Sequence, residues 1–212
     1  MGLIHIELFT TLDLVAQAPG GPEEDPEGFP FGGWQAPLID EWSGTQIAEA
    51  YDGTDALLLG RRTYDIFAAY WPHVGEEEGG GFGALFNSIP KYVASRGTPD
   101  LSWEGSVQLG PDLPAAVREV RDRHEHVHVV GSLDLVQTLL RERLYDRIDL
   151  LVHPIVLGVG KKVFDGGAVP TNLTLLEPPA AGPKGAVMLR YALADGVPRT
   201  GDMTAPDLGL ES

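Results

Sequence analysis

The sequence contains no cysteine among its 212 residues. Disulfide bonds, cysteine-ligated metal sites and cysteine nucleophiles are therefore excluded. The chain also lacks an apolar run long enough to span a bilayer. Its first residues, MGLIHIELFTTLD, have neither the basic region nor the small-residue cleavage site of a signal peptide. We accordingly expect a protein without a transmembrane helix, located in the cytoplasm.

Positive charge is scarce, because 15 Lys and Arg residues stand against 31 Asp and Glu residues and give a formal net charge of −16. Such a surface repels nucleic acids and anionic membranes, which are polyanions, so small molecules or proteins are the expected partners. The acidic clusters 23–27 and 76–78 are typical of solvated loops, and the six histidines show no ligand spacing, so we predict no metal site. The cations that do gather are the candidates for binding an anion: Arg61, Arg62, Arg96, Lys161 and Lys162.

Neither GxGxxG after the first expected strand nor GxxxxGK[ST] occurs, so the common dinucleotide and P-loop motifs are absent. Instead, LLLGRRTYDIFAAYWP (57–72) predicts a buried strand, a glycine turn and a helix in succession. One helix face carries apolar residues at the i, i+3, i+4, i+7 spacing, namely Tyr64, Phe67, Ala68 and Trp71. The first turn offers free N–H groups and two guanidinium groups to an anion. The alternative is that these arginines only solvate the start of a helix.

The rest of the chain alternates short apolar strands with amphipathic helices. Strands are expected at residues 3–11, 55–59, 91–95, 107–109 and 127–130, and helices at 43–50, 82–88, 113–124 and 133–144, the first capped by Ser43. This alternation predicts a largely parallel sheet with helices on both faces. Strands at 147–157, 173–176 and 186–192 follow without a helix between them, which predicts an antiparallel end to the sheet. Pro154 should force a bulge or an edge position in the first of these three.

Residues 17–37 form a long segment rich in glycine, proline and acid that also carries Phe29, Phe31 and Trp34. Long ordered loops in compact domains are usually lids or binding loops. The alternative is a disordered insert, although a solvated insert has little use for three aromatic side chains. We expect one domain over residues 1–194 and a loosely attached C-terminal tail over 195–212.

Three polar segments follow predicted strands: Gly60 to Thr63, Ser95-Arg96 and Gly131-Ser132. Ligands of open α/β sheets bind outside the carboxyl ends of the strands. The three segments are therefore expected to converge on one site.

With these segments the chain resembles the dihydrofolate reductase superfamily, and more closely the branch of the C-terminal reductase domain of bifunctional riboflavin-biosynthesis proteins. The motifs, in the family's order, are TTLD (10–13), APGGPEEDPEGFPFGGW (18–34), LLLGRRTYDIFAAYWP (57–72), PKYVASR (90–96), VHVVGSLDLVQTLL (127–140) and DRIDLLVHPIVLGVGKKVF (146–164). The resemblance implies the three-layer α/β fold of dihydrofolate reductase. Its central sheet is mostly parallel, with an antiparallel C-terminal end and helices on both faces.

The resemblance also implies an NADPH-dependent reductase that transfers a hydride to a C=N, C=O or C=C bond of a small heterocyclic or carbonyl compound, pteridine-like or aminopyrimidine-like. The residues implied to hold the dinucleotide phosphates are Gly60, Arg61, Arg62, Thr63, Gly131, Ser132 and Leu133. Ser95 and Arg96 would take the adenosine 2′-phosphate. The nicotinamide would lie near Thr11, Val15, Ala16 and Gln17.

The catalytic candidates are Asp13, for substrate contact or proton delivery, and Asp40, whose segment loosely resembles the one that carries the acid of folate reductases. The alternatives are a turn-capping role for Asp13 and a helix-capping role for Asp40. The relatives usually read Ser-Leu-Asp-Gly after the first strand, whereas this chain has Leu14 in place of the glycine. That change narrows the expected site and supports a second hypothesis, a binding module without turnover.

Trp34, Tyr64 and Trp71 are the expected walls of a pocket for a flat substrate; the alternative is that they are core under the long loop. Finally, relatives commonly form dimers. The late strands carry more apolar residues than one sheet face needs, namely Ile148, Leu150, Val152, Ile155 and Val156. We therefore expect a homodimer built on the antiparallel edge.

Overall fold

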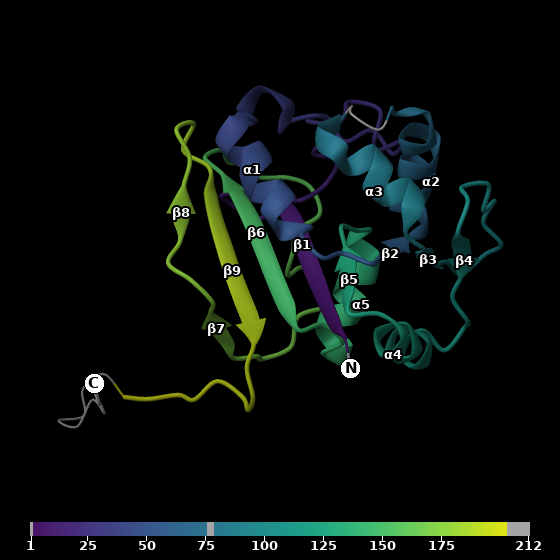
Figure 1. Cartoon of the computed structure of the whole chain (residues 1–212). Helices are drawn as coiled ribbons and strands as arrows, with labels where there is room; N and C mark the ends of the chain where they lie inside the picture. The colour runs from purple at the N-terminus through teal and green to yellow at the C-terminus, as the bar shows by residue number, and fades with distance from the viewer. Residues whose placement is uncertain (1, 76–78, 203–212) are drawn as a thin grey trace.

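The computed structural model describes residues 2–75 and 79–202. Its strands form one sheet in the order β4-β3-β2-β5-β1-β6-β9-β7, with β8 paired to β9 (Figure 1). The strands are β1 Leu3–Thr11, β2 Ala56–Gly60, β3 Lys91–Ala94, β4 Ser106–Gln108, β5 His126–Val129, β6 Arg147–His153, β7 Leu173–Leu175, β8 Ala180–Ala181 and β9 Val187–Leu193. The helices are α1 Glu41–Ala50, α2 Arg61–Tyr70, α3 Phe82–Ser88, α4 Leu113–Arg123 and α5 Leu133–Glu142, with short 3-10 turns at Ala36–Leu38, Trp71–His73 and Gly79–Gly81.

Neighbouring strands from β4 to β6 are parallel, whereas β9 pairs antiparallel with β6, β7 and β8. The predicted mostly parallel sheet with an antiparallel C-terminal end is therefore confirmed. The predicted extent of the strand over 147–157 was wrong, because β6 ends at His153, directly before Pro154. Proline has no backbone N–H to donate, so Pro154 ends the strand instead of forming a bulge within it.

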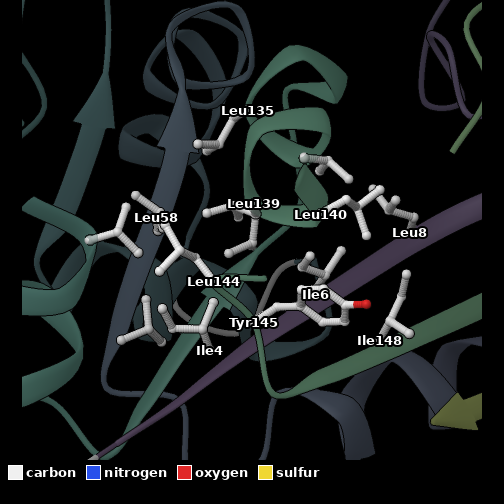
Figure 2. Close-up of a cluster of buried hydrophobic side chains, with 14 of the residues drawn as sticks. Ile4, Ile6, Leu8, Leu58, Leu135, Leu139, Leu140, Leu144, Tyr145 and Ile148 are labelled. Atoms are coloured by element: carbon white, nitrogen blue, oxygen red, sulfur yellow. The ribbon is translucent and has the colours of Figure 1, made fainter. Parts of the chain in front are cut away.

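Helices cover both faces of the sheet because successive strand side chains point to opposite sides. On one face, Figure 2 shows Ile4, Ile6 and Leu8 of β1 packed against Leu139 and Leu140 of α5. On the other face, Leu57 and Leu59 of β2 pack in a separate aromatic-rich cluster together with Tyr51, Tyr64, Phe86, Val93 and Trp103. Burying a leucine-sized side chain contributes roughly 1.5–3 kcal/mol. These two clusters hold the strand ends on which the site is built.

Helix α1 begins two residues earlier than expected, and Asp40, not Ser43, is its N-cap. The Asp40 carboxylate accepts hydrogen bonds from the Ser43 backbone N–H and from the Ser43 hydroxyl, both at 2.8 Å. The sequence Asp40-x-x-Ser43 places an acceptor where the first turn has free N–H groups. Ser43 therefore serves as the third residue of the helix.

The apolar residues on which the homodimer was predicted are mostly covered by the chain itself. Ile148, Leu150 and Val152 are buried in the core beside α5. Of the five predicted residues Val156 is exposed, and so are Leu173, Leu175 and Leu176 in the segment of β7. The homodimer stays a prediction, but the argument from buried β6 side chains was wrong.

The C-terminal segment leaves the sheet after β9, and residues 195–202 are exposed along their length (Figure 1). The remainder of the predicted tail, 203–212, lies outside the described residues, as does the acidic cluster 76–78. Within 2–75 and 79–202, no helix combines the length and the hydropathy needed to cross a membrane.

Candidate functional site

Two adjoining cavities lie where β1, β2, β3 and β5 run into their following turns. The first, of about 310 Å³, is walled by the middle of β1, the long loop after it, α2 and the turn between β5 and α5. The second, of about 760 Å³, is walled by the ends of β2 and β3, the β4–α4 turn and the first half of α5. Arg62, Ser132 and Asp134 line both cavities, so the two cavities adjoin at these residues.

The three polar segments predicted to converge do meet at the second cavity, which is lined by Gly60, Arg61 and Arg62, by Ser95 and Arg96, and by Ser132. The turns after β2 and β5 approach each other closely, and the Gly60 N–H donates to the Gly131 carbonyl oxygen at 2.9 Å. Glycine permits this approach because it has no Cβ. A Cβ on Gly60 would lie 2.1 Å from the Ser132 hydroxyl oxygen and 2.7 Å from the Ser132 backbone nitrogen. The β2–α2 and β5–α5 turns therefore touch backbone to backbone, with the first turns of α2 and α5 side by side.

Gly60→Ala should destabilise the protein by about 1–3 kcal/mol, because the added methyl group has to displace the β5–α5 turn. The Gly60 backbone (φ −72°, ψ 152°) suits alanine, so any loss reports crowding and not conformational strain. Gly97→Ala is the matched control, since a Cβ there would meet nothing within 4 Å. Urea unfolding measures both variants, and equal midpoints would contradict the close contact.

The arginines around the cavities differ in whether they already form ion pairs within the chain. Arg61 donates through Nε to Asp65 at 2.7 Å, and Arg62 pairs with Glu27 of the long loop. Arg96, in contrast, forms no ion pair with any residue that the structure describes. It lines the larger cavity and is therefore free to bind an external anion there.

The loop expected over residues 17–37 is ordered and forms one wall of the smaller cavity through Gln17, Ala18, Pro19, Gly20, Glu24, Asp25 and Gln35. Its start is fixed to the loop after β6, because the Gln17 side-chain oxygen accepts from the Lys161 N–H at 2.8 Å. Of the four residues predicted beside the nicotinamide, Ala16 and Gln17 line this cavity. Thr11 and Val15 are fully buried behind the turn.

Asp13 lies outside both cavities and braces the turn after β1. Its carboxylate accepts from the Thr11 hydroxyl at 2.6 Å and from the N–H groups of Leu157 and Gly158 at 3.2 and 2.9 Å. The hydrogen bond from Thr11, reinforced by those two N–H groups, lowers the pKa of Asp13 to about 2. A carboxylate held ionised in this way is a poor proton donor, so the geometry favours the turn-capping alternative.

Leu14 adopts φ +65°, the left-handed conformation that a glycine takes readily. A leucine in this conformation costs roughly 1–2 kcal/mol, which a glycine at the same position would not.

Asp40 also lies outside both cavities. The Ser43 N–H and hydroxyl lower the pKa of its carboxylate, consistent with its capping role at the start of α1. Neither carboxylate that the sequence suggested for catalysis reaches the cavity.

The three predicted aromatic walls separate into two groups. Trp71 lines the smaller cavity beside Phe67 of α2. Trp34 is 7% exposed and donates its indole N–H to the Gln17 carbonyl oxygen at 2.9 Å. Tyr64 is fully buried, and its hydroxyl accepts from the backbone N–H of Trp103 at 3.2 Å. Trp34 and Tyr64 therefore fit the alternative reading as core, and only Trp71 faces the cavity.

Sequence reasoning missed an ionisable residue in the cavity wall, Glu7 of β1. Its Oε2 lies 2.9 Å from Nε2 of His128 on β5, and the ring of Tyr51 stacks on that imidazole at 4.0 Å. The sequence did contain a sign of this pair. His5 and Glu7 lie on one face of a strand whose other face is apolar, and ionisable side chains are rarely fully buried without partners.

Burial sets the ionisation of this pair. Desolvation raises the pKa of Glu7 to about 8 and lowers the pKa of His128 to about 3. Both shifts favour the neutral form of each group near pH 7.

Comparison with known proteins identifies the family of the chain. The family described as the RibD C-terminal domain matches residues 3–185. The uncharacterized protein YyaP of Bacillus subtilis is 26% identical over 112 residues, which span 52% of this chain and 59% of that relative's length.

Solved structures agree on the fold. A pyrimidine reductase-like protein from Corynebacterium diphtheriae superposes with a TM-score of 0.63 at 15% identity, covering 92% of this chain and 93% of that one. The diaminohydroxyphosphoribosylaminopyrimidine deaminase/5-amino-6-(5-phosphoribosylamino)uracil reductase of Thermotoga maritima gives a TM-score of 0.61 at 14% identity, covering 91% of this chain and 57% of that longer one. Because one family matches nearly the whole of the sheet and its helices, the chain belongs to the RibD C-terminal domain family.

Proposed function

We propose that the protein is an NADPH-dependent reductase that acts on a small aminopyrimidine-like or pteridine-like heterocycle. The observation that carries the proposal is the convergence of two helix N-termini and Arg96, which has no ion-pair partner among the described residues, on one cavity that adjoins an aromatic-walled one. Membership of the RibD C-terminal domain family supports a reductase. Some relatives are named as pyrimidine or uracil reductases.

The larger cavity fits a dinucleotide phosphate group. The N-caps of α2 and α5, Gly60 and Ser132, make no side-chain hydrogen bond to their helices, so the first-turn N–H groups stay available to an anion. Arg61, Arg62 and Arg96 add guanidinium groups suited to bidentate phosphate contacts. When bound, NADPH supplies the hydride.

The smaller cavity fits the substrate. Its volume of about 310 Å³ and its aromatic walls, Tyr51, Phe67 and Trp71, suit a flat ring system. The chain's own contribution is to orient that ring, to exclude water and to deliver a proton.

The competing reading, a binding module without turnover, is favoured by the positions of Asp13 and Asp40 outside the cavities. NADPH fluorescence titration followed by absorbance loss with aminopyrimidine, dihydropteridine and imine substrates separates the two. Consumption of NADPH with one of these compounds supports the reductase, and binding without consumption supports the module.

Cofactor preference gives a sharper test. NADPH should bind more tightly than NADH, and Arg96→Ala should remove about 1.5–3 kcal/mol of NADPH affinity, the contribution of a hydrogen bond to a charged group. NADH affinity should stay nearly constant, because NADH lacks the 2′-phosphate. Calorimetric titration measures all four constants.

Arg123→Ala is the control for that test, since Arg123 forms only a surface pair with Glu119. Equal affinities of the wild type for NADPH and NADH would refute the assignment of Ser95 and Arg96.

A further inference from the structure

We propose that Glu7 donates the proton to the substrate, from a carboxyl group that His128 holds in the wall of the smaller cavity. This inference rests on the proposed reductase function and adds to it the identity of the acid. Asp13 and Asp40 lie elsewhere, so a reductase working in this cavity needs another source for the proton that accompanies the hydride.

The first argument is the position of the side chain. Glu7 lies near the middle of β1, the strand between β5 and β6, and lines the cavity beside Leu8 and Phe9. It is 2% exposed, so bulk water does not solvate its carboxyl group. A ligand in the cavity would lie directly against this residue.

The second argument is an incomplete set of hydrogen bonds. Oε2 is bonded to His128, but Oε1 is fully buried and has no hydrogen-bond partner among residues 2–75 and 79–202. Buried polar atoms are nearly always partnered, by protein, water or ligand. A substrate atom in the cavity would complete the set.

The third argument concerns the direction of the hydrogen bonds. Thr54 lies with its hydroxyl oxygen 3.4 Å from Nδ1 of His128, and Nε2 of the same ring faces Glu7. A neutral imidazole that accepts from Thr54 donates through Nε2 to Oε2 of Glu7. With His128 in this tautomer, the carboxyl proton of Glu7 resides on Oε1, the oxygen without a partner.

The charges around Glu7 act in both directions on its ionisation. His5, Arg147 and Arg190 favour the carboxylate and Asp149 opposes it, while desolvation is the largest effect and keeps the carboxyl group protonated. The charged groups elsewhere in the cavity wall are Glu24, Asp25, Arg62, Asp134 and Lys161.

Tyr51 is the other donor in this wall, and burial raises the pKa of its phenol further above 10. Near pH 7 the phenol is the weaker acid of the two.

The step balances for a C=N substrate. The π bond breaks as the hydride and its electron pair reach carbon and the Glu7 proton reaches nitrogen, so one C–H and one N–H bond form. The dihydronicotinamide is oxidised and the substrate reduced. Glu7 is left as a carboxylate and recovers its proton from solvent. The substrate class implied is a ring or chain imine whose nitrogen accepts a hydrogen bond from a carboxylic acid.

The first experiment needs no substrate. Infrared spectroscopy of the wild-type protein should show the carbonyl stretch of a protonated carboxylic acid at pH 6 that disappears as pH rises through about 8. Glu7→Gln should lack this band, and Glu49→Gln, which alters an exposed acid of α1, should retain it. If the wild type has no such band, the proposal is overturned.

The second experiment measures turnover of NADPH with an imine substrate. Glu7→Gln should lower kcat by about 10²–10⁴-fold, the usual contribution of a general acid, with NADPH affinity close to wild type and a melting temperature no lower than that of the wild type. The wild-type kcat should fall above pH 8 together with the infrared band, whereas the residual Glu7→Gln rate should be flat there. Glu49→Gln should behave as wild type.

The outcomes separate the two proposals. Normal turnover by Glu7→Gln, or loss of the alkaline fall in Tyr51→Phe, overturns the role of Glu7 while the reductase stands. A wild type that binds NADPH and reduces nothing overturns the proposed function, and the donor role with it. Should Glu7→Gln fail to fold, the wild type still decides, because a band and a rate that titrate at different pH values refute the assignment.

Discussion

Between pH 6.5 and 8, the free energy of unfolding of the wild-type protein should fall relative to that of the Glu7→Gln variant. Burial raises the pKa of Glu7 to about 8 in the folded state, against an ordinary value of 4.5. The folded state therefore binds the Glu7 proton more tightly, and its stability falls as pH rises from 4.5 through 8. Over that whole interval the fall is on the order of 5 kcal/mol, of which roughly 2 kcal/mol lies above pH 6.5.

Both proteins carry the same histidines, so the difference between their curves isolates Glu7. Desolvation lowers the pKa values of His5, His128 and His153, so their contribution to stability grows as pH rises through 6.5, in the direction opposite to that of Glu7. Urea unfolding at half-unit steps from pH 6.5 to 8 gives the free energy of unfolding for both proteins. Parallel curves would show that Glu7 is already ionised in the folded protein at pH 6.5.

Trp34→Ala should destabilise the protein by about 3–5 kcal/mol while NADPH affinity per folded molecule stays unaltered. The indole is buried, packs edge-on against the His153 ring at 5.4 Å and donates to the Gln17 carbonyl. Removing it leaves a void under the long loop and an unpaired carbonyl oxygen. Thermal and urea unfolding measure the loss.

Trp71→Ala is the comparison that separates core from cavity wall. Trp71 lines the smaller cavity and is only partly buried, so its loss should weaken substrate binding more than it lowers the melting temperature. Trp34→Phe should recover most of the packing and lose the single hydrogen bond, about 1 kcal/mol. A Trp34→Ala protein of normal stability with poor substrate binding would restore the pocket role.

The fold was predictable because local patterns and burial agree. Buried strands such as β2 are continuous apolar runs, and α5 carries leucines at helical spacing, so both elements could be found from the sequence. The two-residue strand β8 was not found, because its pairing with β9 leaves no periodic pattern in so short a segment. The ends of helices were harder to predict where one capping side chain sets the boundary, as Asp40 does at the start of α1.

The candidate site was predictable to the extent that glycines and cations mark it. Gly60, Arg96 and Gly131 stand at strand ends, and a parallel sheet places such ends at one edge. The partnership of Glu7 with His128 was not accessible in the same way, because it joins residues 121 positions apart and depends on the register of β1 against β5. Likewise, a sequence does not say whether a turn aspartate such as Asp13 faces the ligand or its own backbone.

The backbone contact between the β2–α2 and β5–α5 turns has a consequence for redesign. Position 60 has to be varied together with 132, and position 131 together with 63, since a methyl group on Gly60 would lie 2.1 Å from the Ser132 hydroxyl oxygen and one on Gly131 would lie 2.7 Å from the Thr63 hydroxyl oxygen. Libraries that randomise them singly will return mostly the parent sequence. Ser95 and Arg96 line the opposite side of the same cavity, so under the proposed binding of NADPH they are the positions at which to attempt an exchange of cofactor specificity.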